Sequence, residues 1–197
     1  MTLAVIAIGW GGILLAAPRE VHSGEEGLVA FDEFLEGGGL GPDEKILGMV
    51  GFCGQALPAE WLFLTGKPDD FGAGLRESVF AQGKILAERT LKVFAGQDLP
   101  HLPIERGRLK VTTANAYETA VARAKDEKVS FKSVRYQLRV RDAGNEPVWL
   151  ISFLNRAQVG IGVVYVSAET GEVLRENWRV EGGKRTDSDN PSKITSR

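Results

Sequence analysis

The chain has 197 residues, of which 43% are hydrophobic and 25% charged, and this ordinary globular composition excludes a coiled coil, a collagen-like repeat and wholesale disorder. Its 24 basic and 26 acidic residues nearly cancel, so we expect no nucleic-acid partner and no binding to an anionic membrane surface. One cysteine cannot form a disulfide within the chain, and two histidines with it are too few for a usual zinc site. The composition therefore predicts a globular protein without a metal or cofactor.

The first 17 residues form an apolar run without a charge, followed by Pro18, Arg19 and Glu20. The run is shorter than the roughly 20 apolar residues that span a bilayer. Ser23 is a small residue of the kind read by signal peptidase. Residues 1–23 are predicted to be a signal peptide or, alternatively, a short N-terminal anchor, and the protein is predicted to be exported to the periplasm or the extracellular space.

Two stretches of the chain, 61–89 and 149–177, resemble each other without a gap at an offset of 88 residues. Seven of their 29 positions are identical, including Trp61 with Trp149. Composition alone would give about two identities, and such self-similarity indicates an internal duplication. The period is too long for a solenoid repeat, so the duplication predicts two small units in tandem.

The first unit begins with a helix from Ser23 or Gly24 that ends at the glycines 37–39. Strands are expected at 45–53, 60–65, 74–81 and 84–94. Residues 95–110, which include Pro100 and Pro103, form the expected linker.

The second unit begins with a helix over residues 113–126, where apolar residues recur at helical spacing. Apolar and polar residues then alternate from 134 to 141, a period of two that is typical of a half-buried strand. Further strands are expected at 148–154, 161–168 and 172–180, and the polar tail 181–197 is expected to be disordered.

These patterns predict an α+β protein of two tandem small domains, residues 24–94 and 111–180, each one helix packed on an antiparallel meander of about four strands. The second unit resembles the PepSY family in helix residues 116–124, in Pro147-Val148-Trp149 and in the hairpin segment 164–174. Ser167 stands where the family usually has Asp. The resemblance implies a PepSY/cystatin-like fold without catalytic residues, and contacts with a protease or another envelope protein.

Three further features of the sequence are explained better by structural roles than by chemistry. Cys53 with His101 as base is the only candidate for nucleophilic chemistry, and no local motif supports it. The glycine pairs at 72 and 74 and at 160 and 162 lack the rest of a dinucleotide fingerprint and are expected to mark a bulge or a close backbone approach. Residues 187–190 begin like a calcium loop but lack its glycine and closing glutamate.

The two units differ in charge. Residues 24–108 contain 8 basic and 14 acidic residues, whereas 109–180 contain 11 basic and 8 acidic. Arg135, Arg139 and Arg141 place positive charge on one face of a predicted strand, which is either an ordinary solvated surface or a contact face for an acidic partner or the acidic first unit. These arginines are the candidate partner face.

The sequence thus predicts an exported, non-enzymatic binding or inhibitory module of the cell envelope. A small-molecule carrier with a cavity between helix and sheet is the alternative, and a thiol hydrolase using Cys53 is a weaker one.

Overall fold

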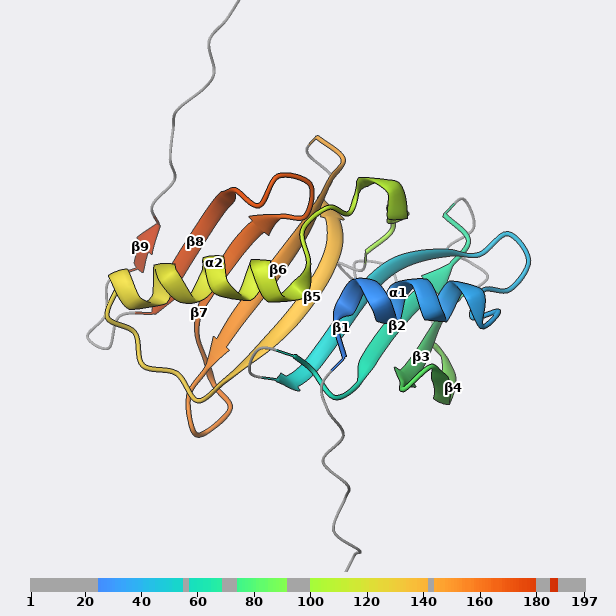
Figure 1. Ribbon diagram of the computed structural model, residues 1–197, viewed down its shortest axis with the longest axis horizontal. Coiled ribbons are helices and arrows are strands. Elements are labelled where there is room, and N and C mark those ends of the chain that lie inside the picture. The colour runs from blue at the N-terminus through green and yellow to red at the C-terminus, as the bar shows by residue number, and fades with distance from the viewer. Residues whose placement is uncertain are drawn as a thin grey trace, which may run out of the picture.

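A computed structural model of the chain describes residues 25–54, 57–68, 74–91, 100–141, 144–179 and 185–187. Two α-helices each precede a series of antiparallel strands (Figure 1). In chain order the elements are α1 (Gly27–Glu36), β1 (Lys45–Gly54), β2 (Trp61–Gly66), β3 (Leu75–Ala81), β4 (Lys84–Leu91), the 3-10 turn η2 (Arg106–Arg108), α2 (Thr113–Asp126), β5 (Ser133–Arg141), β6 (Glu146–Leu154), β7 (Gly160–Ser167), β8 (Val173–Arg179) and β9 (Arg185–Asp187).

The strands form one continuous antiparallel sheet in the order β4-β3-β2-β1-β5-β6-β7-β8-β9, in which β9 is only three residues long. The prediction of two tandem helix-on-meander domains, 24–94 and 111–180, is therefore wrong. A separate four-stranded meander would leave the backbone groups of its first strand unpaired at an edge. Here β1 and β5 pair with each other, so neither first strand is an edge and the two halves share one sheet.

The pairing of β1 with β5 is symmetric. Val50 lies opposite Gln137, and the neighbouring pairs are Met49 with Leu138 and Gly51 with Tyr136. Met49 and Tyr136 are 87 residues apart, as are Gly51 and Leu138 and also Val50 and Gln137. Each half thus offers the same strand to the other, as identical subunits do at a two-fold interface. The duplication is organised about a pseudo-two-fold axis at the Val50–Gln137 pair, where the local spacing of 87 residues is one fewer than the 88-residue offset of 61–89 and 149–177.

Both helices lie on the same face of the sheet and point away from each other, with their N-termini meeting near the middle (Figure 1). Between them and the sheet lies one main hydrophobic core, which contains Phe31 and Phe34 of α1, Ala116 and Ala120 of α2, and strand residues of both halves. A shared core is the second reason why the halves are not separate domains, because neither could be removed without exposing the apolar surface of the other.

The helix α2 covers residues 113–126, as predicted, but its N-cap is Thr112, whose hydroxyl accepts from the Asn115 N–H at 3.2 Å. The helix α1 begins at Gly27, later than predicted, because the Glu26 carboxylate accepts from the N–H groups of Leu28 and Val29. A carboxylate at this position suits the positive end of the helix dipole.

The hairpin segment that resembles the PepSY motif forms the β7–β8 turn. Gly171 has a φ of 80°, the left-handed conformation that the turn requires and that glycine adopts at little cost. The Ser167 hydroxyl accepts from the N–H groups of Glu169 and Thr170, at 3.3 and 3.1 Å. A short acceptor side chain at 167 thus holds the turn, which is a role that an aspartate could also fill.

The segment from 100 to 112 ties the halves together, although much of it was predicted to be an unstructured linker. Ile104 donates its N–H to the Ile46 carbonyl of β1 at 2.8 Å. Arg106 pairs with Asp32 of α1 through two hydrogen bonds, and Arg108 pairs in the same way with Glu169 beyond β7. This segment therefore fixes α1 and the β7–β8 turn relative to one another.

The predicted signal peptide or anchor, residues 1–23, lies outside the described residues. Residues 185–187 of the predicted disordered tail form β9 on β8, and the rest of that tail also lies outside the description. In the part of the chain that is described, neither helix has the length and apolar character needed to cross a membrane.

Candidate functional site

The candidate partner face lies on the side of the sheet opposite the helices. In β5, Val134, Tyr136 and Leu138 are fully buried beneath α2, while the residues between them point the other way. Arg135 is exposed, and Arg139 and Arg141 are partly exposed. The predicted alternation of a buried and a solvated face is confirmed, and we call the solvated side of β5 to β8 the open face.

Among the residues that the structure describes, the arginines of the open face do not dock against the acidic first half. Within the described ranges, Arg135, Arg139 and Arg141 form no ion pair. The halves meet instead through the β1–β5 ladder and the helix N-termini. The charges of this face are thus left for solvent or for another molecule.

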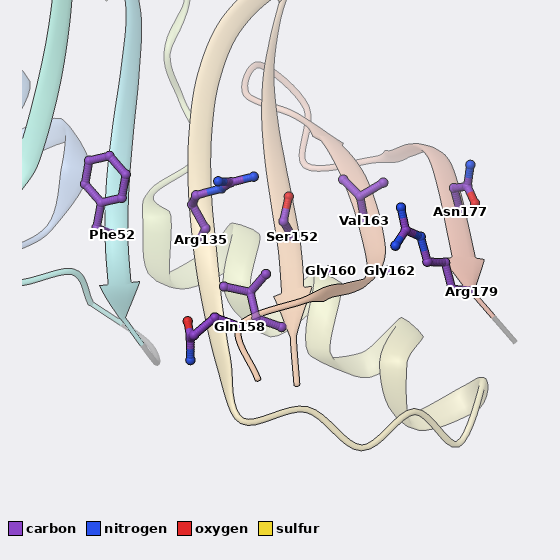
Figure 2. A pocket seen from close by; sticks show the side chains of 10 residues that line it. Phe52, Arg135, Ser152, Gln158, Gly160, Gly162, Val163, Asn177 and Arg179 are labelled. Atoms are coloured by element: carbon purple, nitrogen blue, oxygen red, sulfur yellow. The ribbon is translucent and has the colours of Figure 1, made fainter. Parts of the chain in front are cut away.

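A groove with a volume of about 420 Å³ runs across the open face (Figure 2). Its floor is a row of residues that lie opposite one another on successive strands: Arg135 of β5, Ser152 of β6, Val163 of β7 and Asn177 of β8. Phe52 of β1 closes one end, with 42% of its surface exposed. Further lining residues are Leu154, Gln158, Gly160, Gly162 and Arg179.

Arg135 and Arg179 stand on opposite sides of this groove, and Figure 2 shows both guanidinium groups turned toward its middle. Neither has an acidic partner among the described residues. Ser152 and Asn177 between them offer neutral hydrogen-bonding groups. Two unpaired guanidinium groups above a polar floor form a site suited to carboxylate or phosphate.

Arg179, Asn177 and Ser152 were not predicted as site residues. A weak signal for two of them lies in Asn177 and Arg179, which flank the apolar Trp178, but the polar Glu176 hides the period of two that is visible in β5. Nothing local marks Ser152, which belongs to a nearly continuous apolar strand.

The glycines of β7 have the structural role that was predicted. The register of β6 and β7 shifts between Phe153 and Leu154, opposite Gly162 and Gly160. A Cβ on Gly162 would lie 2.1 Å from the Trp178 ring, so only glycine fits there. The bulge and the close approach are thus confirmed at this pair. Gly72, its counterpart in the first half, lies outside the described residues.

The carrier alternative placed a cavity between helix and sheet. A hollow of about 490 Å³ lies where α2 ends beside the sheet, lined in part by Val129, Ile161 and Trp178. The indole N–H of Trp178 is buried without a hydrogen-bond partner in the described part of the chain. This hollow differs from the groove in carrying both signs of charge on its rim, from Glu127, Lys128 and Arg179.

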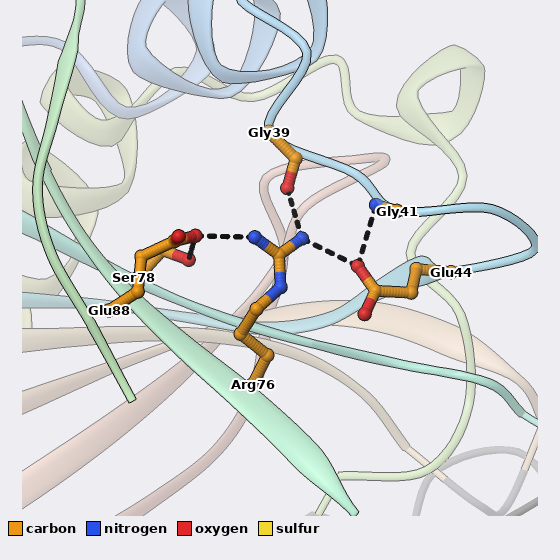
Figure 3. Close-up of polar contacts among 6 residues, drawn as sticks. All are labelled: Gly39, Gly41, Glu44, Arg76, Ser78 and Glu88. Atoms are coloured by element: carbon orange, nitrogen blue, oxygen red, sulfur yellow. Dashed lines mark hydrogen bonds and ion pairs between the residues drawn. The ribbon is translucent and has the colours of Figure 1, made fainter. Parts of the chain in front are cut away.

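In the first half, a network of charged residues lies at the loop after α1. Arg76 of β3 donates to the Gly39 carbonyl at 2.6 Å and to Glu44 at 2.5 Å, and it also pairs with Glu88, which accepts from the Ser78 hydroxyl (Figure 3). Burial by itself would raise the pKa of Glu44, but the hydrogen bonds from Arg76 and from the Gly41 N–H outweigh it and lower that pKa. This network fixes the loop after α1 and leaves no free cation there.

The nucleophile hypothesis gains no support. The side chain of Cys53 lies outside the described part of the structure, so its distance to His101 is not defined. Among the described residues no group of three or more His, Cys, Asp or Glu side chains could hold a metal ion. The calcium-like residues 188–190 are outside the description as well.

No family model matches the chain, and no curated protein matches it. The resemblance to the PepSY family therefore stands on the sequence motif alone.

Proposed function

We propose that this protein is an exported, non-enzymatic binding or inhibitory module that holds an acidic segment of a protease or another envelope protein on its open face. The observation that supports the proposal is the set of arginines on that face without acidic partners in the described structure, Arg135, Arg139, Arg141 and Arg179. An isolated surface arginine is usually paired or solvated. Several arginines on one sheet face instead create a positive surface that is complementary to a negative partner.

The architecture favours a binding role. Both helices cover one face of the sheet, so the other face is left for a partner over the second half. The resemblance of residues 164–174 to the PepSY motif also supports a binding role, because membership of that family would imply contacts with proteases or other envelope proteins. An inhibitory contact is one form that such binding would take.

The experiment is capture from an envelope extract with the full chain, followed by measurement of the dissociation constant with the purified captured protein. We expect affinity to fall between low and high salt, because exposed charges are screened over about 10 Å at 0.1 M. Arg135→Ser combined with Arg139→Ser should weaken binding while changing the free energy of unfolding by less than about 0.5 kcal/mol. A partner whose affinity depends on neither salt nor these arginines would overturn the proposal.

Export is proposed separately from the apolar run at residues 1–17. Mass spectrometry of the protein recovered from its native cell should find a new N-terminus near residues 17 to 23. Intact Met1 on protein recovered from the cytoplasm would refute export and would leave the binding proposal unaffected.

A further inference from the structure

The two halves differ at one position on the open side of the sheet, which is filled in the first half and hollow in the second. In the first half a separate apolar cluster lies there, made of Leu47, Leu64 and Leu75 with Leu91 packed against them. Leu47 and Leu64 are 0% and 8% exposed, so this position is filled and dry. The first half thus shows what the duplicated unit looks like when this part of the sheet has only a packing role.

In the second half the corresponding residues form the groove. Leu64 and Leu91 lie 88 residues before Ser152 and Arg179, the offset of the duplication, and Leu47 lies next to Gly48, which pairs with Leu64 as Arg135 pairs with Ser152. Leu75, which pairs with Leu91, lies 88 residues before Val163 of the groove floor. Where the first half has these leucines, the second half thus has Arg135, Ser152, Val163 and Arg179, three of which are polar. The groove is present because the second half lacks the leucine cluster that fills this position in the first half.

We infer that the groove is the recognition pocket of the open face, and that it takes an extended peptide with an acidic residue at each end and an apolar residue between them. This inference rests on the proposed function and assigns to it a place and a ligand pattern. The guanidinium groups of Arg135 and Arg179 would each bind one carboxylate, and Val163 with Phe52 would contact the apolar side chain.

The spacing of the strands sets the pattern. The backbones of β5 and β8 are three strands apart, which corresponds to about 14 Å. In an extended peptide, residues i, i+2 and i+4 point to the same side, and the first and last are about 13 Å apart. Acidic residues at i and i+4 therefore reach both sides of the groove, while the side chain at i+2 lies over its floor.

A macromolecular ligand suits this groove better than a small molecule. The floor of the groove is formed by residues side by side on neighbouring strands. The groove is open along the sheet face, where Arg135 is solvent-exposed. Small-molecule sites usually bury most of their ligand in a concave cavity. An extended segment, in contrast, needs only one side of its chain covered.

The test is a fluorescence-anisotropy titration of the full chain with the labelled peptide Glu-Ser-Leu-Ser-Glu at low salt. We expect saturable binding, weaker binding of Glu-Ser-Ser-Ser-Glu, and none of Lys-Ser-Leu-Ser-Lys. Arg135→Ser and Arg179→Ser should each weaken binding about tenfold. Arg141→Ser, which removes one charge of the open face outside the groove, should weaken binding less than either groove variant does.

A charge-neutral variant separates the pocket from the general basic face. Ser152→Leu places in the groove the residue that fills the equivalent position, Leu64, in the first half. It should abolish peptide binding, with the folded state verified by circular dichroism. Equal losses in all three arginine variants, with binding intact in Ser152→Leu, would overturn the pocket and leave the basic face as the binding surface. Absence of any peptide binding would overturn the pocket too, and the salt dependence of the captured partner would then decide the proposed function by itself.

Discussion

Trp61 and Trp149 pack against each other across the pseudo-two-fold axis, with ring centroids 6.2 Å apart. Each indole N–H donates to a carbonyl two residues before the first residue of a helix, Trp61 to Glu25 at 3.1 Å and Trp149 to Val111 at 3.0 Å. The two tryptophans thus place the N-termini of α1 and α2 symmetrically, and their conservation within the duplication follows from that shared task.

The helix N-termini meet at this point through Gly27 and Thr113. The Gly27 N–H donates to the Thr113 hydroxyl at 3.0 Å, and a Cβ on Gly27 would lie 2.4 Å from that oxygen and 3.0 Å from both tryptophan rings. Gly27→Ala should therefore lower the free energy of unfolding by about 1–3 kcal/mol. Urea denaturation measures it, with Gly107→Ala, where a Cβ meets nothing within 4 Å, as the matched control. Equal stabilities of the two variants would contradict the close approach.

One carboxylate caps both helices. Glu26 accepts from the N–H groups of Leu28 and Val29 at the start of α1, and its other oxygen accepts from the Thr113 N–H of α2 at 2.6 Å. We expect Glu26→Ala to cost about 2 kcal/mol, more than the roughly 1 kcal/mol of Thr112→Ala, which removes one cap from one helix. The ranking is checked by denaturation of both variants, and a larger loss in Thr112→Ala would disprove the shared cap.

Glu25 makes stability depend on pH. Burial, together with the hydrogen bond and charge repulsion from Glu33, raises its pKa from 4.5 to about 7, against a smaller opposing effect of the Gln82 backbone. Between these values the folded state holds a proton that the unfolded state has lost, so the contribution of Glu25 to stability falls as pH rises from about 4.5 to 7.

Glu25→Gln should remove this dependence and be more stable than the wild type at pH 8, with little difference near pH 4.5. Thermal or chemical denaturation across this range measures the effect. Glu36→Gln, on an exposed residue at the end of α1, serves as the control. A wild-type profile parallel to that of Glu25→Gln would rule out the raised pKa as the cause.

Local patterns predicted the elements well, since α2 occupies residues 113–126 and β5 alternates as expected. Their assembly depended on contacts that no local pattern carries. Gly48 and Gly51 are unfavourable residues inside a strand, yet Gly48 lies against Pro100, and a Cβ on Gly51 would meet Pro58 at 2.4 Å and Trp61 at 2.7 Å. These glycines are explained only by the partners that the fold brings to them.

The candidate site was predicted in part. The arginines of β5 were found because a charged alternation is visible along one strand, whereas the groove combines residues of strands β1, β5, β6, β7 and β8. Its most informative feature, leucines in one half against Arg135, Ser152 and Arg179 in the other, required both the duplication offset and the cluster seen in the structure.

The central claim is that the open face, and not the helix face, binds an acidic segment. Titration of the isotopically labelled full chain with Glu-Ser-Leu-Ser-Glu, followed by amide chemical shifts, tests it most directly. The account predicts shifts concentrated at Arg135, Ser152, Val163 and Asn177, with Ala116 and Ala120 of α2 unchanged. Shifts confined to α1 and α2, or no shifts at saturating peptide, would contradict it.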